Sequence, residues 1–202
     1  MPSARGNYPL HRSSIAKCAW FKLFTVLLWV VVFVPCLRAQ KSKPTDYQVK
    51  AVYLINFARF VEWPDKVGMQ QDSFTICVFG SDPFGRTLDT TLAGEKIAGR
   101  SAIAKRISTP QDSVDCRILF VSSAETGLLE RMIEAVSKQG VLTVSDMPQF
   151  VNRGGMIQFV TDEKRVRFEV NLTAAQRAGL TLSSELLKVA TVVRTNDTAG
   201  DQ

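Results

Sequence analysis

The sequence predicts an α/β domain with a mixed β-sheet, and three observations support this fold class. Short runs dominated by apolar residues, at 74–79, 117–121 and 141–144, are typical of strands that are covered on both faces. Helical patterns lie between these runs, so strands and helices alternate along the chain. Two further runs, 156–160 and 166–170, flank a charged turn and indicate a β-hairpin. Strands that alternate with helices tend to pair in parallel, whereas a hairpin pairs two strands antiparallel. The two patterns together predict a mixed sheet.

A helix is predicted at the start of the domain. Its apolar residues recur at helical spacing, and Pro64, directly after Trp63, is expected to end it. Asn56 falls inside this apolar stripe, which predicts a buried and hydrogen-bonded amide. The residues that we expect to face the core are Val49, Val52, Tyr53, Phe57, Phe60 and Val61.

Two helices and a strand are predicted in the middle of the chain. After the first apolar run, Ser81 or Asp82 is expected to cap a helix. The stretch 101–107 predicts a strand that follows a glycine-containing turn. Apolar residues within 128–136 form one helical stripe, and Gly140 is expected to end that helix.

The C-terminal part of the domain predicts two helices after the hairpin. Asn171 is a suitable cap for a short helix, which Gly179 would close. Ser183 is expected to start a last amphipathic helix that continues through Val193.

The N-terminal segment has the pattern of a secretory signal peptide. A basic, acid-free start is followed by an apolar run from Leu23 to Pro35 and by small or neutral residues before position 40. A membrane anchor is the alternative, but the run is shorter than the roughly twenty residues that a spanning helix needs. A lipoprotein cleavage at Cys36 is a second alternative. We therefore expect a signal peptide over 1–39, a linker over 40–46, the α/β domain over 47–194 and a flexible tail over 195–202.

Removal of residues 1–39 would change the chemistry of the chain. That segment holds five of the 25 basic residues and none of the 19 acidic ones, which leaves a net charge near +1 and no case for nucleic-acid binding. It also holds His11, the only histidine. The remaining chain then lacks histidine-based catalytic and metal sites. We expect no catalytic residue, no metal and no cofactor, and a protein that binds a partner and is not an enzyme.

Cys77 and Cys116 are the two cysteines of the predicted domain. An even pair in a small exported domain predicts a disulfide. The alternative is a pair of buried free thiols in neighbouring strands.

Short polar residues follow three of the predicted strands. If those strands are parallel, the residues lie on one edge of the sheet, where α/β proteins bind ligands. The alternative, which we favour from sequence, is that they are caps and turn formers. The candidate ligand rim consists of Ser81, Asp82, Ser122, Ser145 and Asp146.

Aromatic residues concentrate on the first helix and just after it. Trp63 lies at the predicted helix end beside Glu62 and Pro64, and Phe60 precedes it by one turn. Burial in the core is the default explanation for such residues. Aromatic side chains that remain at the surface are favoured anchors for partners, so Phe60 and Trp63 are candidate partner-binding residues.

Several segments of the chain resemble the YfiR family. They follow the order of that family and extend over nearly all of residues 47–193: YQVKAVY at 47–53, NFARFVEWP at 56–64, GSDPFG at 80–85, LTVSD at 142–146, GGMI at 154–157 and RFEVN at 167–171.

The resemblance implies a Rossmann-like three-layer α/β domain that lies in the periplasm and often forms a homodimer. It implies inhibition of a membrane diguanylate cyclase through contact with its periplasmic part, which lowers cyclic-di-GMP signalling and biofilm formation. An outer-membrane lipoprotein is a further implied partner, and another membrane sensor could replace the cyclase. Cys77 and Cys116 fall where the family places a disulfide, whereas the second cysteine pair of YfiR is missing here. The alternative function is that of a periplasmic small-ligand sensor serving another membrane receptor.

Overall fold

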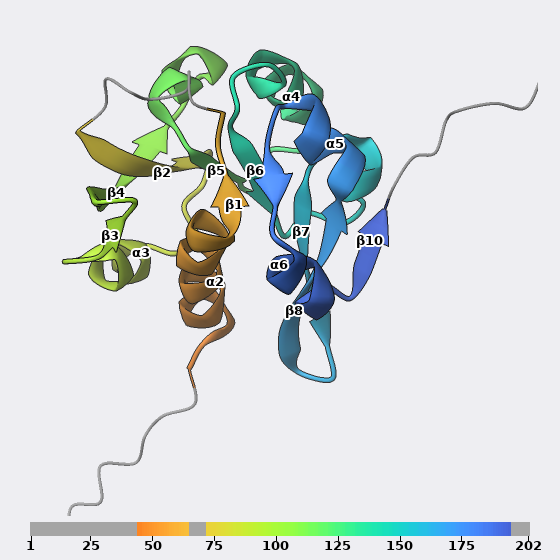
Figure 1. Ribbon diagram of the computed structural model, residues 1–202, viewed down its shortest axis with the longest axis horizontal. Coiled ribbons are helices and arrows are strands. Elements are labelled where there is room, and N and C mark those ends of the chain that lie inside the picture. The colour runs from red at the N-terminus through yellow and green to blue at the C-terminus, as the bar shows by residue number, and fades with distance from the viewer. Residues whose placement is uncertain (1–43, 65–71, 195–202) are drawn as a thin grey trace, which may run out of the picture. The chain divides into compact units, whose positions relative to one another are not determined.

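The computed structural model describes residues 44–64 and 72–194, so the expected signal peptide and tail lie outside the described residues (Figure 1). Strands and helices alternate as the sequence predicts. In chain order the elements are α2 (Asp46–Phe60), β1 (Val61–Glu62), β2 (Ser73–Phe79), α3 (Arg86–Leu92), β3 (Lys96–Ile97), β4 (Arg100–Ile107), the 3₁₀ helix η1 (Pro110–Asp115), β5 (Ile118–Val121), α4 (Leu129–Val136), β6 (Leu142–Ser145), the 3₁₀ helix η2 (Val151–Arg153), β7 (Ile157–Asp162), β8 (Arg165–Asn171), α5 (Leu172–Arg177), β9 (Thr181–Leu182), α6 (Ser184–Val189) and β10 (Val192–Arg194).

The main sheet is mixed, as predicted, and in the described part of the chain it has eight strands in the order β10-β8-β7-β6-β5-β2-β4-β3. Strands β4, β2, β5, β6 and β7 run parallel to one another, and β3 pairs antiparallel with β4 at one edge. The predicted hairpin is formed by β7 and β8, which pair antiparallel with Phe159 opposite Phe168. The short strands β1 and β9 pair separately as a two-stranded sheet.

The central strands have a hydrophobic core on each face, which gives the domain its three layers. Along β5, Ile118 and Phe120 belong to the core that packs against α2, α3 and α6. The alternate residues Leu119 and Val121 belong to a second core that includes the buried face of α4. Because successive side chains of a strand point to opposite faces, one strand contributes to both cores. This arrangement confirms the predicted three-layer α/β fold.

Helix α2 is present as predicted, but its buried face and its end differ from the prediction. Val52 and Phe60 are exposed, and Asn56 is only half-buried. Of the predicted residues within the helix only Phe57 is fully buried, because the packing of the helix in the fold, which local spacing does not set, decides the buried face. The buried residues of α2 are Lys50, Ala51, Leu54, Ile55, Phe57 and Ala58. The helix ends at Phe60 and not at Pro64, because the chain becomes extended at Val61 and pairs with β9.

The two predicted caps after β2 are wrong. Helix α3 begins at Arg86, and its N-cap is Gly85, whose φ of 52° suits glycine. Asp82 instead closes a local turn, because its Oδ1 accepts a hydrogen bond from the backbone N–H of Phe84 at 2.8 Å.

The predicted C-terminal helices are confirmed at their starts. Asn171 caps α5 by accepting from the N–H of Ala174, and Ser183 caps α6 by accepting from the N–H of Leu186. Helix α6 nevertheless ends at Val189, where the prediction continued it through residue 193. The chain after it forms β10, which pairs parallel with β8 and so satisfies backbone groups at that edge of the sheet.

Candidate functional site

The five residues of the candidate ligand rim lie at one edge of the sheet. Strands β2, β5 and β6 are parallel neighbours, so their carboxyl ends share an edge. Ser81 and Asp82 follow β2, Ser122 follows β5, and Ser145 with Asp146 ends β6. The predicted convergence of these strand ends is confirmed. Ligand binding at this rim stays a prediction.

Two serines of the rim have hydrogen bonds within the protein. Ser145 is fully buried; its hydroxyl donates to the carbonyl of Val121 at 2.7 Å and accepts from the N–H of Met147 at 3.0 Å. The hydroxyl of Ser122 accepts from the N–H of Ala124 at 3.4 Å. These contacts connect β5 to β6 and shape the turns that follow, which is the structural role that the sequence also suggested.

Asp146 is bound to helix α2 by two side chains. Its Oδ2 accepts from the ammonium of Lys50 at 2.6 Å and from the hydroxyl of Tyr47 at 2.8 Å. The side chains of Lys50 and Asp146 are only 9% and 11% exposed, so this is a buried ion pair. Burial, and then the bond to Asp146, raise the pKa of Tyr47 to about 12. The contacts hold the first half of α2 against the end of β6.

Asp82 belongs to a second ion-pair network. Its Oδ2 accepts from Nε of Arg106 at 2.8 Å, and the same guanidinium donates to both carboxylate oxygens of Asp89 at 2.7 Å. Arg106 also donates to the carbonyl of Gly85 at 2.7 Å. The hydrogen bond from Arg106 is the main cause that lowers the pKa of Asp89. This network connects β4 both to the turn before α3 and, through Asp89, to α3 itself.

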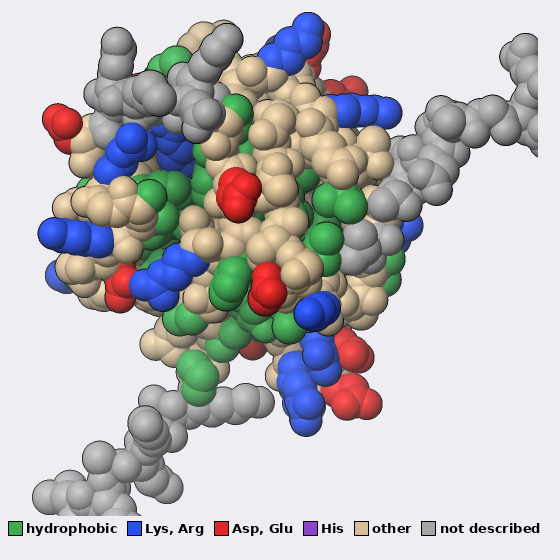
Figure 2. Space-filling model, viewed as in Figure 1, with side chains coloured by type: hydrophobic (Ala, Val, Ile, Leu, Met, Phe, Trp, Pro, Cys, Tyr) green, Lys and Arg blue, Asp and Glu red, His purple; other side chains and the backbone are tan. Residues whose placement is uncertain are grey.

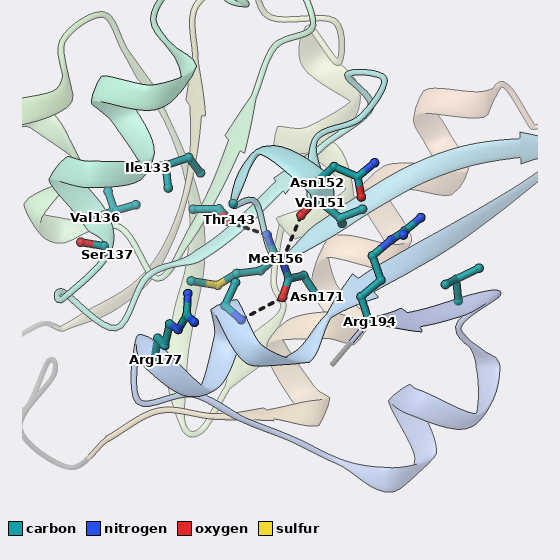
Figure 3. A pocket seen from close by; sticks show the side chains of 13 residues that line it. Ile133, Val136, Ser137, Thr143, Val151, Asn152, Met156, Asn171, Arg177 and Arg194 are labelled. Atoms are coloured by element: carbon teal, nitrogen blue, oxygen red, sulfur yellow. Dashed lines mark hydrogen bonds between the residues drawn. The ribbon is translucent and has the colours of Figure 1, made fainter. Parts of the chain in front are cut away.

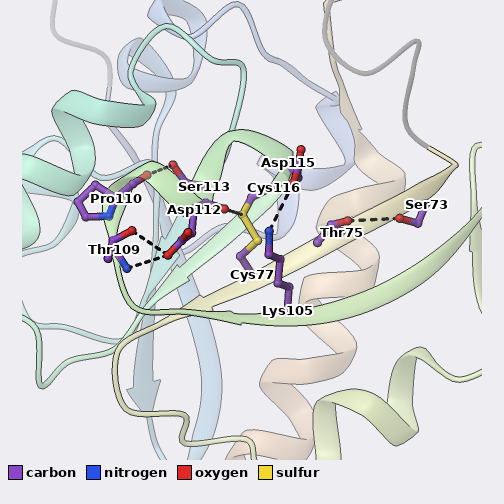
Figure 4. Close-up of a disulfide and its surroundings, with 10 residues drawn as sticks. All are labelled: Ser73, Thr75, Cys77, Lys105, Thr109, Pro110, Asp112, Ser113, Asp115 and Cys116. Carbon is purple, nitrogen blue, oxygen red and sulfur yellow. Dashed lines mark hydrogen bonds and ion pairs between the residues drawn. A yellow bond between two sulfur atoms is a disulfide. The ribbon is translucent and has the colours of Figure 1, made fainter.

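The predicted disulfide between Cys77 and Cys116 is present (Figure 4). Cys77 lies in β2 and Cys116 two residues before the start of β5, and both are buried in the core that faces α4. Their Cα atoms are 5.7 Å apart, within the ordinary range for a disulfide. The 3₁₀ helix η1 comes directly before Cys116 in the chain. Its N-cap, Thr109, is bonded to Asp112, and this contact helps to fix the segment that leads to Cys116. The bond therefore fastens two central strands to each other.

The two candidate partner-binding residues have different environments. The side chain of Phe60 is 41% exposed at the last position of α2. Trp63 is half-buried and packs edge-on against Phe74, with 5.3 Å between the ring centroids. Phe60 is thus available at the surface, whereas Trp63 lies at the border of the core. Their role in partner binding stays a prediction.

A cavity of about 810 Å³ lies beside α4, α5 and β10 (Figure 3). The side-chain amide of Asn171 lines this cavity. It donates to the carbonyl of Val151 at 2.9 Å and accepts from the N–H of Ala174. Thr143 accepts from the N–H of Met156 at 3.1 Å. These polar groups therefore hold the walls together. From sequence, Asn171 was visible only as a helix cap.

A second cavity, of about 630 Å³, is lined by four basic side chains and one acidic side chain and is named the Arg117 cavity. Arg117 precedes β5, is 3% exposed, and its Nη2 has no hydrogen-bond partner among the described residues. Burial, and then the nearby charge of Arg100, lower the pKa of Arg117. The indole N–H of Trp63 is likewise buried without a partner in this part of the chain. The cavity is lined by Ala58, Arg59, Val61, Glu62, Trp63, Pro64, Phe74, Lys96, Ile97, Ala98, Arg100 and Arg117.

Over residues 44–64 and 72–194, no group of three or more His, Cys, Asp or Glu side chains is arranged to hold a metal ion. Within the same ranges, no helix is long and apolar enough to cross a membrane.

Comparison with known proteins gives the family of the chain. Residues 47–191 match the sequence profile described as YfiR/HmsC-like. The chain belongs to the YfiR/HmsC-like family. Among solved structures, it is similar to a conserved domain protein from Vibrio cholerae O1 biovar El Tor, with 15% identity and a TM-score of 0.52. The match covers 76% of this chain and 62% of that one, and at this identity it shows the fold alone. A search of curated proteins returns no match.

Proposed function

We propose that this member of the YfiR/HmsC-like family is a periplasmic regulatory protein that inhibits a membrane diguanylate cyclase by contact with the cyclase's periplasmic part. Inhibition would lower cyclic-di-GMP and, with it, biofilm formation. Family membership supports the regulatory class. The observation that carries a role in protein contact is an apolar strip on the outward face of α2.

The α2 strip consists of Val49, Val52, Tyr53 and Phe60. Val52 is 50% exposed and Phe60 41%, while Val49 and Tyr53 are half-buried. The first three line a shallow groove of about 450 Å³. Figure 2 shows hydrophobic side chains at the surface around α2 and α6. A contiguous apolar patch at the surface is a feature of protein-binding sites, and the groove with Val52 at its rim is the centre of this one.

The neighbouring helix extends this surface. Helix α6 packs against α2, and its Val189 is 59% exposed. No catalytic histidine is needed for such a role, since the surface acts by shape and apolar contact. Aromatic anchors such as Phe60 contribute most when a partner buries them fully.

The test is the intracellular cyclic-di-GMP level in the native bacterium. We expect deletion of the gene to raise this level and the exported wild-type protein to restore it. A copy whose residues 1–39 are removed should fail, because it would remain on the wrong side of the membrane. An unchanged level after deletion would contradict the proposed function.

The α2 strip is tested by paired variants. Val52→Gln with Phe60→Gln should leave the protein folded yet unable to restore the low level. The control is Ile103→Gln with Val114→Gln, which removes two exposed apolar side chains, 44% and 68% exposed, from β4 and η1. The control should restore the level fully. Full restoration by the α2 variant would remove the strip from the proposal and leave the function itself standing.

A further inference from the structure

The Arg117 cavity contains a buried positive charge without a counterion in the described part of the chain. The guanidinium of arginine stays protonated in proteins, so Arg117 is a buried cation. Buried charges in folded proteins are normally paired, because desolvation without a partner is costly. The backbone of Arg117 is fixed by hydrogen bonds to Thr75 and Leu142 at 2.9 Å, so the residue cannot move its Cα toward solvent without disturbing β5.

The side chains around Arg117 add to the excess of positive charge in the cavity. The lining contains four basic side chains, Arg59, Lys96, Arg100 and Arg117, and one acidic side chain, Glu62. Arg59 is already paired with Glu95 at 2.6 Å, which lies outside the lining. Figure 2 shows basic side chains over the part of the surface where β3 and β4 lie, at the left of the view. The field inside the cavity is therefore positive.

The cavity also offers an uncharged donor and an apolar wall. The indole N–H of Trp63 has no hydrogen-bond partner among the described residues, although it is buried. Its ring and the ring of Phe74 meet edge-on at 5.3 Å and form one side of the space. Two unpartnered donors in a lining that also has an apolar side suit a molecule with an anionic end and an apolar body.

From these observations we infer that the Arg117 cavity binds a small organic anion, whose carboxylate or phosphate group pairs with Arg117 and accepts a hydrogen bond from Trp63. Guanidinium groups match both anions through parallel N–H donors. The volume of about 630 Å³ is within the usual range for small-molecule sites. The inference goes beyond the proposed cyclase contact and does not depend on it.

The test is calorimetric titration of the full chain with two probes, inorganic phosphate and benzoate. We expect saturable binding of at least one probe. Binding of phosphate alone would identify a phosphorylated ligand, and binding of benzoate alone would identify an aromatic carboxylate. Heat that does not saturate with either probe would overturn the inference.

Variants place the bound anion at Arg117. Arg117→Met should weaken binding about tenfold or more, since a hydrogen bond to a charged group is lost. Arg100→Gln, at a half-buried position at the side of the cavity, should weaken it less. The control Arg131→Gln, at an exposed position on α4, should bind as the wild type does. Equal affinity in the wild type and in Arg117→Met would overturn the inference.

Thermal unfolding separates a ligand-binding arginine from a structural one. Without an added anion, Arg117→Met should unfold at the same temperature as the wild type or higher, because the variant no longer buries an unpaired charge. Adding the bound probe should raise the unfolding temperature of the wild type and of Arg131→Gln, and it should not raise that of Arg117→Met. A large loss of stability in Arg117→Met, with no response of the wild type to the probe, would indicate a structural role and contradict the inference.

Discussion

Lys50 and Arg59 are two basic residues on the same helix with different surroundings. Lys50 is paired with Asp146 in a buried contact, and its ammonium lies 4.3 Å from the centre of the Tyr47 ring. Arg59 is paired with Glu95, but both side chains are well exposed to solvent, at 49% and 39%. Solvent screens the second pair and leaves the first largely unscreened.

The difference predicts unequal effects of the same substitution. Lys50→Met should lower the free energy of unfolding by about 3 kcal/mol, because it leaves Asp146 charged and buried without its cation. Arg59→Met should change it by less than about 1 kcal/mol. Methionine has a helix propensity close to that of lysine and arginine, so α2 itself is little affected. Urea denaturation of the two variants measures both values, and equal losses would contradict this account of Lys50.

Single residues also show what sequence reasoning could reach. The disulfide was predictable because two cysteines remained in a domain expected to be exported. The pairing of Lys50 with Asp146 was not, because the two residues are 96 positions apart and only the packing of α2 on the sheet brings them together. The pattern at 117–121 predicts a strand that starts at Arg117, and its neighbours in sequence do not indicate a buried guanidinium.

At the scale of elements, buried strands were easier to predict than edge strands. The strands β2, β5 and β6 are buried along almost their whole length, and most of their residues are apolar because both of their faces are covered. The strands β1, β9 and β10 have two or three residues each, and they exist through backbone pairing with neighbours that are distant in sequence. No local pattern marks such short pairings, which is why the last helix was predicted to run through β10.

The disulfide joins two of these buried strands and supports a prediction on stability. It joins two cysteines, Cys77 and Cys116, that are 39 positions apart in the sequence. On the chain-entropy model, reduction should lower the free energy of unfolding by about 4 kcal/mol. Urea denaturation with and without reductant measures this loss. The variant Cys77→Ala with Cys116→Ala is the control and should be indifferent to reductant; titratable thiols in the unreduced, unfolded wild type would contradict the bond.

At the scale of the whole domain, two hydrophobic cores depend on the same strands. The first core contains Ile118 and is covered by α2, and the second contains Leu119 and is covered by α4. Loss of β5 would expose apolar surface on both sides of the sheet at once. The two layers of helices should therefore unfold together, although they do not form a common core.

This shared dependence predicts one unfolding transition for both faces. Ile118→Ala and Leu119→Ala, at two fully buried positions, should each cost about 2–5 kcal/mol, with the slope of the urea dependence unchanged. Hydrogen exchange at rising denaturant should give α2 and α4 the same limiting free energy in the wild type, and both variants should lower it in both helices. If Leu119→Ala weakened protection in α4 and left α2 unchanged, the faces would unfold independently. The sheet would then connect two separate folding units, each with its own stability.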